Sequence, residues 1–309
     1  MNRSGKFHAL LATARIANVP SVVSNVWLGV VIGLFIGRVK GSEPLWPVAG
    51  SLALAGILLY VGGNFLNDWM DRDWDQAHRP ERALPGKIFQ PGSYLTAAIG
   101  LMMAGVGLAA LGNWRSMAVA AGIVACIVVY TIWHKRTSWA VVPMGLCRGL
   151  LPVMGFEAFY PYVDGIWPAA CGLLCYIAGL SLSARYESLA EPPKLTGMMA
   201  RLLLLATAVL MAWGSHAMAL ARLPVLIGAL PYLAWTSYCL RFRRRPVPRL
   251  VSGLLAGIPL VDWMVLLPAF LMMVSYSDGN MTLMAAACLL GPPLAFILAL
   301  LLQRLAPAT

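Results

Sequence analysis

The chain has 309 residues, of which 60% are hydrophobic and only 11% are charged, whereas about a quarter of the residues in a soluble domain are usually charged. Mean hydropathy is +0.75, and apolar runs of about 20 residues, long enough to cross a bilayer, recur along the chain. These values exclude a soluble domain, and the lack of period-two alternation excludes a membrane barrel. The net charge of +11 comes from basic residues in short loops, which indicates membrane topology and excludes a nucleic-acid partner.

Ten apolar segments follow one another without a linker long enough to separate soluble domains, so we expect a single domain over residues 1–309. We place the segments at 17–37, 46–67, 92–112, 114–133, 139–157, 165–184, 198–218, 222–241, 250–274 and 281–303. The pattern predicts an all-α membrane bundle of about nine to ten transmembrane helices. The segment 250–274 contains Pro259 and Asp262, so we expect it to be interrupted or partly re-entrant.

The distribution of Lys and Arg predicts the orientation of this bundle. If the N-terminus and the even-numbered segment exits share one side, eighteen of the 23 basic residues lie on that side and four on the other. Because basic loops stay in the cytoplasm, we expect both termini to be cytoplasmic. The stretches 64–86 and 134–136 then lie on the cytoplasmic side as well.

The stretch 64–86 contains five of the twelve acidic residues and directly follows an apolar segment. On a helix, Asn67, Asp71 and Asp75 share one face because four residues turn it by slightly more than a full circle. Asp68 lies beside that face. Carboxylates placed so closely repel one another, and a hard dication relieves that repulsion. Oxygen ligands alone favour Mg²⁺ or Ca²⁺ over zinc.

Two interpretations of this acidic cluster compete with each other. A calcium-binding EF-hand loop starting at Asp71 would need Gly at its sixth position and Glu at its twelfth, but the sequence has Gln76 and Arg82 there. The other interpretation is Mg²⁺ held by a few carboxylates and completed by substrate phosphates, which the following basic residues Arg79, Arg82 and Lys87 would suit. A solvated helix end, with ion pairs to those arginines, is the alternative without a ligand.

Four segments resemble the UbiA-type intramembrane prenyltransferases. Residues 67–75, NDWMDRDWD, match the N-D-x-x-D-x-x-x-D motif of that family, and RPERALPG at 79–86 resembles the loop that follows it. ARIANVPSVVSNVWLG at 14–29 is similar to the first helix of the family, and YTIWHKR at 130–136 to its Tyr-x-x-x-x-Lys-Arg segment. The resemblance implies a helical bundle with a central cavity and Mg²⁺-dependent transfer of a prenyl group. The donor would be an isoprenyl diphosphate and the acceptor an aromatic or otherwise lipophilic molecule in the membrane.

The resemblance also assigns roles to particular residues. The implied metal ligands are Asn67, Asp68, Asp71 and Asp75, of which Asp71 and Asp75 are also the central catalytic candidates. The implied substrate-binding residues are Lys135 and Arg136, which would contact phosphate or else only anchor topology. We add Arg79, Arg148, Tyr130 and Tyr186 to the substrate-binding candidates because of their positions in the sequence. The basic side chains would neutralise phosphate. Each tyrosine would either line the pocket of the allylic cation or belong to an interfacial aromatic belt.

The chain departs from the family where a second aspartate-rich motif is expected. GLSLSARYESLAEPPK at 179–194 contains no aspartate, and Glu187 and Glu191 are its acidic residues. We therefore add Arg185 and Glu187 to the catalytic candidates, because a guanidinium group binds phosphate oxygens in bidentate fashion. This form of the motif resembles a bacterial subgroup represented by the C protein of the Ebo gene cluster, and that resemblance implies a location in a bacterial inner membrane.

Two charges fall inside apolar segments, Arg148 in 139–157 and Asp262 in 250–274. Because a charge at bilayer depth is costly, each is expected to face the interior of the bundle. They either pair with each other, or Arg148 reaches the acceptor or the diphosphate from the cavity wall. The same charges would suit a second function, a carrier or transporter of a lipophilic metabolite precursor that keeps the cavity without catalysing a reaction.

Overall fold

The computed structural model describes residues 3–37, 45–160, 165–185, 194–217, 222–243, 245–276 and 282–306, and this part of the chain forms helices and no strands. The helices are α1 (Arg3–Thr13), α2 (Val19–Gly37), α3 (Leu45–His78), α4 (Pro91–Ala109), α5 (Trp114–Trp133), α6 (Val141–Glu157), α7 (Trp167–Arg185), α8 (Lys194–Ala217), α9 (Arg222–Phe242), α10 (Val247–Ala256), α11 (Ile258–Tyr276) and α12 (Leu283–Leu302). Short 3-10 turns, η1 (Ile16–Asn18) and η2 (Ser138–Ala140), precede α2 and α6. The predicted all-α fold is therefore confirmed.

The ten predicted apolar segments coincide with α2 to α9, with α10 and α11 together, and with α12. Within the described residues, nine segments are long and apolar enough to cross a membrane. The helix α9 is the predicted segment that does not meet this apolar criterion, although its 21 residues are sufficient in length. Length and composition therefore support nine spans among the described residues, the lower end of the predicted range of nine to ten.

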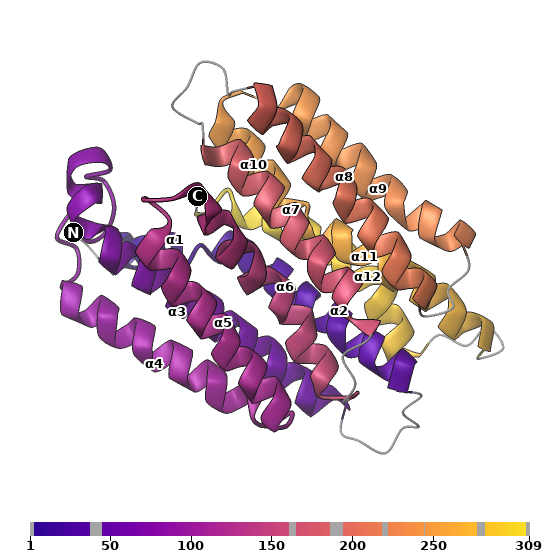
Figure 1. Cartoon of the computed structure of the whole chain (residues 1–309). Helices are drawn as coiled ribbons and strands as arrows, with labels where there is room; N and C mark the ends of the chain where they lie inside the picture. The colour runs from indigo at the N-terminus through magenta and orange to yellow at the C-terminus, as the bar shows by residue number, and fades with distance from the viewer. Residues whose placement is uncertain are drawn as a thin grey trace.

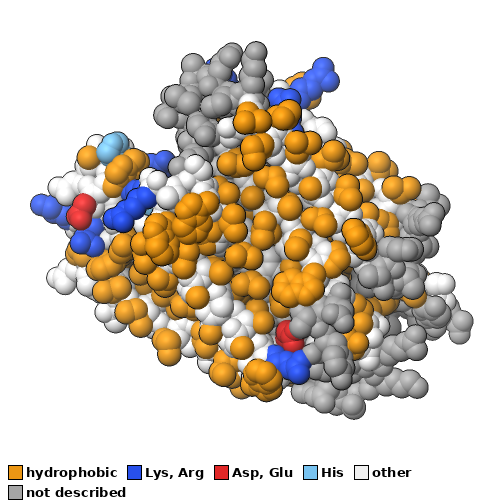
Figure 2. Space-filling model, viewed as in Figure 1, with side chains coloured by type: hydrophobic (Ala, Val, Ile, Leu, Met, Phe, Trp, Pro, Cys, Tyr) orange, Lys and Arg blue, Asp and Glu red, His pale blue; other side chains and the backbone are white. Residues whose placement is uncertain are grey.

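The bundle has central and peripheral helices that run roughly parallel to one another (Figure 1). In α2, α6 and the α10–α11 unit, 67%, 61% and 78% of the apolar window is buried, whereas only 22% is buried in α8 and in α12. The peripheral helices turn large apolar side chains outward, and Figure 2 shows a face covered mainly by hydrophobic groups, with charged groups near its margins. This exterior suits contact with lipid chains.

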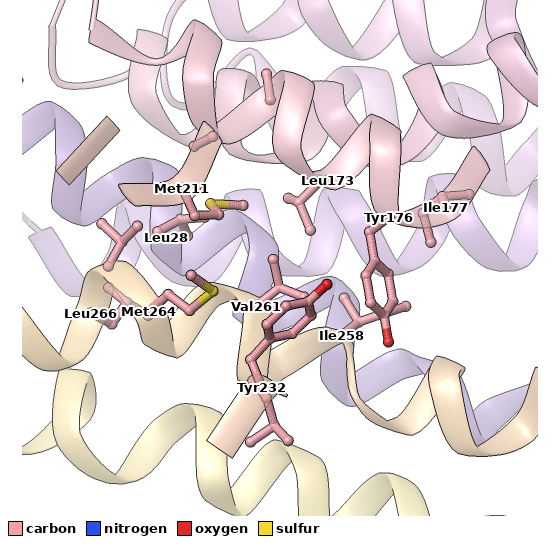
Figure 3. Packing of buried hydrophobic residues seen from close by; sticks show 14 of the residues in the cluster. Leu28, Leu173, Tyr176, Ile177, Met211, Tyr232, Ile258, Val261, Met264 and Leu266 are labelled. Atoms are coloured by element: carbon pink, nitrogen blue, oxygen red, sulfur yellow. The ribbon is translucent and has the colours of Figure 1, made fainter. Parts of the chain in front are cut away.

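The larger hydrophobic core joins the second half of the chain to α2. Leu28 of α2, Leu173 of α7, Met211 of α8, Tyr232 of α9 and Val261 of α11 are all fully buried and converge in this core (Figure 3). A second core packs α2 against α3, α4, α5 and α6. Because α2 and α6 take part in both cores, they hold the two halves of the bundle together.

Small residues let α2 and α6 approach each other closely. A Cβ atom added at Gly29 would overlap the backbone of Pro152, and one added at Gly155 would overlap the backbone of Val26. Small residues at helix crossings are a common means of close packing in membranes. This contact brings the polar face of α2 against α6, and the lower part of the site described below depends on it.

The predicted interruption of segment 250–274 is confirmed, because α10 ends at Ala256 and α11 begins at Ile258. Buried side chains satisfy carbonyl groups at this break. Tyr176 Oη donates to the carbonyl of Leu254 at 2.7 Å, and Trp235 Nε1 donates to the carbonyl of Gly253 at 2.8 Å. Irregular backbone at membrane depth is tolerated where protein groups satisfy it in this way.

We expect Tyr176→Phe to lower the free energy of unfolding by about 1–2 kcal/mol, because it removes a buried donor from the Leu254 carbonyl. Thermal unfolding of the purified protein in detergent measures this loss. Tyr238→Phe is the matched control, since Tyr238 is 45% exposed. Equal stability of the two variants would contradict the assigned role of the Tyr176 hydroxyl.

Candidate active site

A cavity of about 490 Å³ extends from the C-terminal end of α3 into the bundle. Its volume lies within the range of small-molecule sites, roughly 300–1,000 Å³. We call the part lined by Asn67, Asp71 and Asp75 the outer end, and the part lined by Tyr60, Arg148 and Leu151 the inner end. Between and beside them, apolar side chains of α5, α6, α7 and α10 complete the wall. The cavity therefore joins a charged end to an apolar interior.

The predicted face of α3 is present. Asn67, Asp71 and Asp75 all line the cavity, and each is buried, with Asp75 only 2% exposed. Asp68 is also buried but is not among the cavity-lining residues. It points to the arginines beside the cavity instead. The motif thus separates into three residues that face the cavity and one that anchors the surrounding arginines.

Two residues that directly follow α5 contact the carboxylate of Asp71. Lys135 Nζ lies 2.7 Å from Asp71 Oδ1, and His134 Nε2 lies 3.1 Å from Oδ2. The ammonium group of Lys135 also lies 4.2 Å from the centre of the Trp74 ring, a favourable cation–π contact. Both His134 and Lys135 line the cavity. They thus place an ammonium group and an imidazole beside Asp71 in the cavity wall.

The loop after α3 returns Arg82 to the same acidic face. Arg82 Nη1 lies 2.9 Å from Asp75 Oδ2 and 3.4 Å from Asp68 Oδ1. The next two residues, Ala83 and Leu84, are buried in the second core, so apolar packing fixes the position of the loop. The resemblance of residues 79–86 to the family loop therefore corresponds to a well-defined contact with the motif.

Arg15 contributes a further cation from the turn before α2. It has a left-handed backbone conformation with φ of 46°. Its Nη1 donates to Asn64 Oδ1 at 3.0 Å, and its Nη2 lies 3.7 Å from Asp68 Oδ1. The segment 14–29 resembles the first helix of the family, but the sequence alone gave Arg15 no role in the site. Arg15 is a basic residue at the border of an apolar segment, and membrane topology alone is enough to explain a basic residue at such a position.

Protein oxygen atoms at the outer end would supply part of the coordination that a magnesium ion requires, and a bound ligand would supply the rest. The Oδ1 atom of Asn67 is buried, and no group in the described part of the chain donates a hydrogen bond to it, although Nδ2 of the same amide donates to Asp71 at 3.3 Å. No cluster of three or more His, Cys, Asp or Glu side chains able to hold a metal occurs among the described residues. Two carboxylates and this amide oxygen fit Mg²⁺ if phosphate oxygens complete its coordination.

The other predicted substrate-binding residues differ in position. Arg79 and Tyr130 line the cavity, and the ring of Tyr130 stacks on that of His134 with centroids 5.0 Å apart. Arg136 is exposed and is not among the lining residues that the structure describes. Lys135 and Arg136 lie in the turn that follows α5, where the amide of Arg136 donates to the carbonyl of Trp133 at 2.9 Å, and in this turn the two neighbouring side chains do not share the cavity face.

The predicted second-motif residues fall at the edge of the described chain. Tyr186 and Glu187 lie outside the described residues, and of Arg185 only the backbone at the end of α7 is described. The last turns of α7 do border the cavity, through Ser181 and Ala184.

At the inner end, Arg148 lines the cavity from the middle of α6. Its Nη2 donates to Ser21 Oγ at 2.8 Å and its Nη1 to Asn25 Oδ1 at 3.3 Å. Asn25 Nδ2 in turn donates to both carboxylate oxygens of Asp262, at 2.9 and 2.8 Å. Of the two alternatives for these charges, the direct pair between Arg148 and Asp262 is not formed, because the amide of Asn25 lies between them.

We expect Arg82→Gln to destabilise the protein by about 1–3 kcal/mol, because it leaves the buried carboxylate of Asp75 without its close cation. Arg82 is partly exposed, so the loss should be smaller than for a fully buried ion pair. The thermal unfolding midpoint in magnesium-free buffer measures this effect. In the control variant Arg72→Gln, the lost ion-pair partner is Asp73, whose side chain is 83% exposed, and the bond from Arg72 to the Trp69 carbonyl is lost as well. Because no buried carboxylate loses its cation, the midpoint should fall less than that of Arg82→Gln. Equal midpoints for both variants would show that Arg82 does not stabilise the motif.

Comparison with known proteins identifies the family. The sequence model of the UbiA prenyltransferase family matches residues 26–187, just over half of the 309 residues. The chain belongs to the UbiA prenyltransferase family. Members of the UbiA family transfer prenyl groups from isoprenyl diphosphates to lipophilic acceptors, and the nine apolar segments make this member a multi-pass membrane protein.

Individual relatives agree with this UbiA assignment. The protoheme IX farnesyltransferase of Caulobacter vibrioides is 32% identical over 145 residues, which cover 45% of this chain and 42% of that protein. The digeranylgeranylglyceryl phosphate synthase of Methanopyrus kandleri is 35% identical over 96 residues, covering 30% of this chain and 33% of that protein. The chain thus spans less than half the length of each of these two relatives.

Solved structures support the UbiA fold over nearly the whole chain. A UbiA homologue from Aeropyrum pernix superposes with a TM-score of 0.57 at 12% identity, covering 92% of this chain and 98% of the other. A digeranylgeranylglyceryl phosphate synthase structure superposes with a TM-score of 0.52 at 15% identity, covering 96% of both chains. At these identities the likeness concerns the fold alone.

Proposed function

We propose that the protein catalyses Mg²⁺-dependent transfer of a prenyl group from an isoprenyl diphosphate to an aromatic or otherwise lipophilic acceptor in the membrane. The observation that carries the proposal is one cavity with a carboxylate face, cationic side chains around it and a buried amide oxygen without a donor at its outer end. Membership of the UbiA family supports the reaction class.

Each residue of the outer end has a role in this proposal. Asn67, Asp71 and Asp75 would hold the ion, and Asp68 would act through Arg15 and Arg82, which it positions. When bound, Mg²⁺ would neutralise charge on the leaving diphosphate. The side chains of Arg79, His134 and Lys135 line the same space and would bind its phosphate oxygens. Tyr130 would lie beside the allylic cation.

The segment after α7 would complete the diphosphate site. We propose that Arg185, supported by Glu187 and Tyr186, neutralises phosphate where other family members place a second group of aspartates. The last turns of α7 border the cavity, which is compatible with this role. The sequence ARYE at 184–187 supports the narrower proposal of a bacterial Ebo-cluster C-protein subgroup. The distribution of basic residues supports the proposal that the site and both termini lie on the cytoplasmic side.

The decisive experiment uses the purified protein in liposomes with dimethylallyl, geranyl, farnesyl and geranylgeranyl diphosphates and a panel of lipophilic hydroxyaryl acceptors. Pyrophosphate release and diphosphate binding are measured with Mg²⁺ and with a chelator. Mg²⁺-dependent release that requires an acceptor is the expected result, and the best donor gives the prenyl length.

The carrier function predicts a different outcome of the same assay. Arg148 and Asp262 form a buried polar network at membrane depth, which would also suit a polar path through a transporter. Mg²⁺-dependent binding of diphosphates without release, for every acceptor tested, would favour a carrier. Failure to bind any diphosphate would contradict the proposed diphosphate site itself.

A further inference from the structure

Arginines gather where α9 ends and α10 begins. Five of the nine residues at 241–249 are arginines, and the structure describes four of them, which we call the arginine cluster: Arg241, Arg243, Arg245 and Arg249. Arg243 is half-buried, and the other three are exposed. None of the four is among the residues that line the cavity. The cluster is therefore separate from the proposed diphosphate site.

Few acidic groups balance the charge of the arginine cluster. Over residues 192–309 the sequence contains two acidic residues, Asp262 and Asp278. The first is fully buried in α11, and the second lies outside the described residues. In the described part of the chain, no carboxylate lies within 4 Å of the guanidinium groups of Arg241, Arg243 and Arg249. The cluster thus forms a positively charged surface suited to an anionic partner.

Aromatic rings of α9 lie directly beside these arginines. Trp235, Tyr238 and Phe242 follow one another along the helix, with ring centroids 5.5 Å apart in each successive pair. Tyr238 and Phe242 are 45% and 66% exposed. The Cζ atom of Arg241 lies 5.3 Å from the centre of the Phe242 ring. The Cζ atom of Arg243 lies 5.9 Å from the centre of the Trp235 ring. Because Trp and Tyr are enriched at the membrane surface, these rings indicate that the cluster lies at the level of the lipid headgroups.

Packing between helices fixes the base of the arginine cluster. Trp235 Nε1 of α9 donates to the carbonyl of Gly253 in α10 at 2.8 Å. Gln303 Nε2, directly after α12, donates to the carbonyl of Ser252 in α10 at 2.8 Å. The guanidinium group of Arg243 occupies the space over Gly253, where a Cβ atom would come within 3.0 Å of its Nη1. Three helices thus meet beneath the cluster and hold it in place.

The helix α10 connects this surface to the cavity. Val251 lines the cavity, whereas Arg249, two residues earlier and about 200° around the helix, is exposed. A partner bound to the cluster would therefore contact the outer side of a helix whose inner side is a cavity wall.

We propose that the arginine cluster binds the phosphate group of an anionic phospholipid, whose acyl chains lie along Tyr238 and Phe242. A guanidinium group binds phosphate oxygens in bidentate fashion, and clusters of basic residues at the cytoplasmic ends of membrane helices are typical of anionic-lipid recognition. Membrane topology explains basic residues on the predicted cytoplasmic side, but not their contact with exposed aromatic rings. A free phosphate compound would leave those rings uncovered, whereas a phospholipid covers them. The bound lipid would stabilise α10 from outside the cavity.

Native mass spectrometry of the full chain in detergent measures this binding. The probes are dioleoyl phosphatidylglycerol and dioleoyl phosphatidylcholine, which have the same acyl chains but differ in net charge. We expect phosphatidylglycerol to bind about tenfold or more tightly, and to raise the thermal unfolding midpoint more than phosphatidylcholine does. Equal affinity for the two lipids in the unmodified protein would overturn the proposal without any variant.

Double variants then locate the lipid preference. Arg241→Gln with Arg249→Gln removes two exposed charges of the cluster and should abolish most of the preference. Lys6→Gln with Lys87→Gln is the charge-matched control, because both lysines are exposed and lie outside the cluster; its preference should equal that of the unmodified protein. If the two double variants keep or lose the preference to the same extent, the cluster is not the lipid site and the proposal fails.

Two soluble compounds distinguish a lipid site from a site for free phosphate. Glycerol 3-phosphate carries a headgroup phosphate without acyl chains, and geranyl diphosphate carries the phosphate groups of the proposed prenyl donor. At a concentration equal to that of phosphatidylglycerol, neither should displace the lipid from the unmodified protein. Displacement by either compound would overturn the proposal. Lipid binding at the cluster does not depend on prenyl transfer, so a preference that requires Arg241 and Arg249 stands even if no turnover occurs.

Discussion

Asp71→Asn and Asp75→Asn are each expected to lower the kcat/KM of prenyl transfer by about 10²–10³-fold, the largest effect that we expect of any substitution in the cavity. Each change removes one of the two carboxylates that line the outer end, while the amide keeps the size of the side chain. Because neutralisation of the diphosphate depends on this end, the loss should appear in both diphosphate binding and turnover. Pyrophosphate release in liposomes over a range of Mg²⁺ concentrations measures it.

The motif itself provides the matched control for this prediction. Asp73 lies between the two aspartates in the sequence, but its side chain is 83% exposed and pairs with Arg72. Asp73→Asn should therefore keep nearly full activity. If Asp73→Asn and Asp75→Asn lose activity to the same extent, the general charge of the helix end matters and a specific metal-binding face does not.

The second large effect concerns folding, and it arises where α2 crosses α6. We expect Gly155→Ala to destabilise the protein by about 2–3 kcal/mol, because its new Cβ would overlap the backbone of Val26 and force the two helices apart. Both helices belong to both hydrophobic cores, so their separation should loosen the whole bundle. The yield of monodisperse protein and the thermal unfolding midpoint measure this loss.

Gly100→Ala on the peripheral helix α4 tests whether the effect comes from packing. A Cβ atom at Gly100 meets no other atom within 4 Å, and alanine is intrinsically the better helix former by about 1 kcal/mol. Gly100→Ala should therefore be neutral or slightly stabilising, opposite in sign to Gly155→Ala. A midpoint for Gly155→Ala at or above that of the unmodified protein would refute the proposed close contact.

Hydropathy and helical periodicity were sufficient to predict much of this structure. The apolar segments correspond to helices because a backbone in lipid has few other ways to satisfy its hydrogen bonds. The interruption near Pro259 and the shared face of Asn67, Asp71 and Asp75 followed from local rules of helix geometry.

The contacts between distant segments could not be predicted in this way. The role of Arg15 depends on a left-handed turn that brings it to Asn64 and Asp68, 49 and 53 residues away in the chain. The insertion of Asn25 between Arg148 and Asp262 depends on three helices meeting at one level. Periodicity within one segment assigns a residue to a face, but it does not give the rotation of that face toward another helix.

The helix α3 is continuous over 34 residues, from Leu45 to His78, and its length of roughly 51 Å exceeds the hydrocarbon thickness of a bilayer, about 30 Å. Its apolar first part and its carboxylates therefore belong to one rigid rod, and the distance between the membrane anchor and the proposed metal-binding face is constant. In a thicker bilayer, a smaller tilt of the rod or local thinning of the lipid would be needed to keep the carboxylate end of the helix at the membrane surface. Catalytic rate in vesicles should accordingly depend on the acyl-chain length of the surrounding lipid.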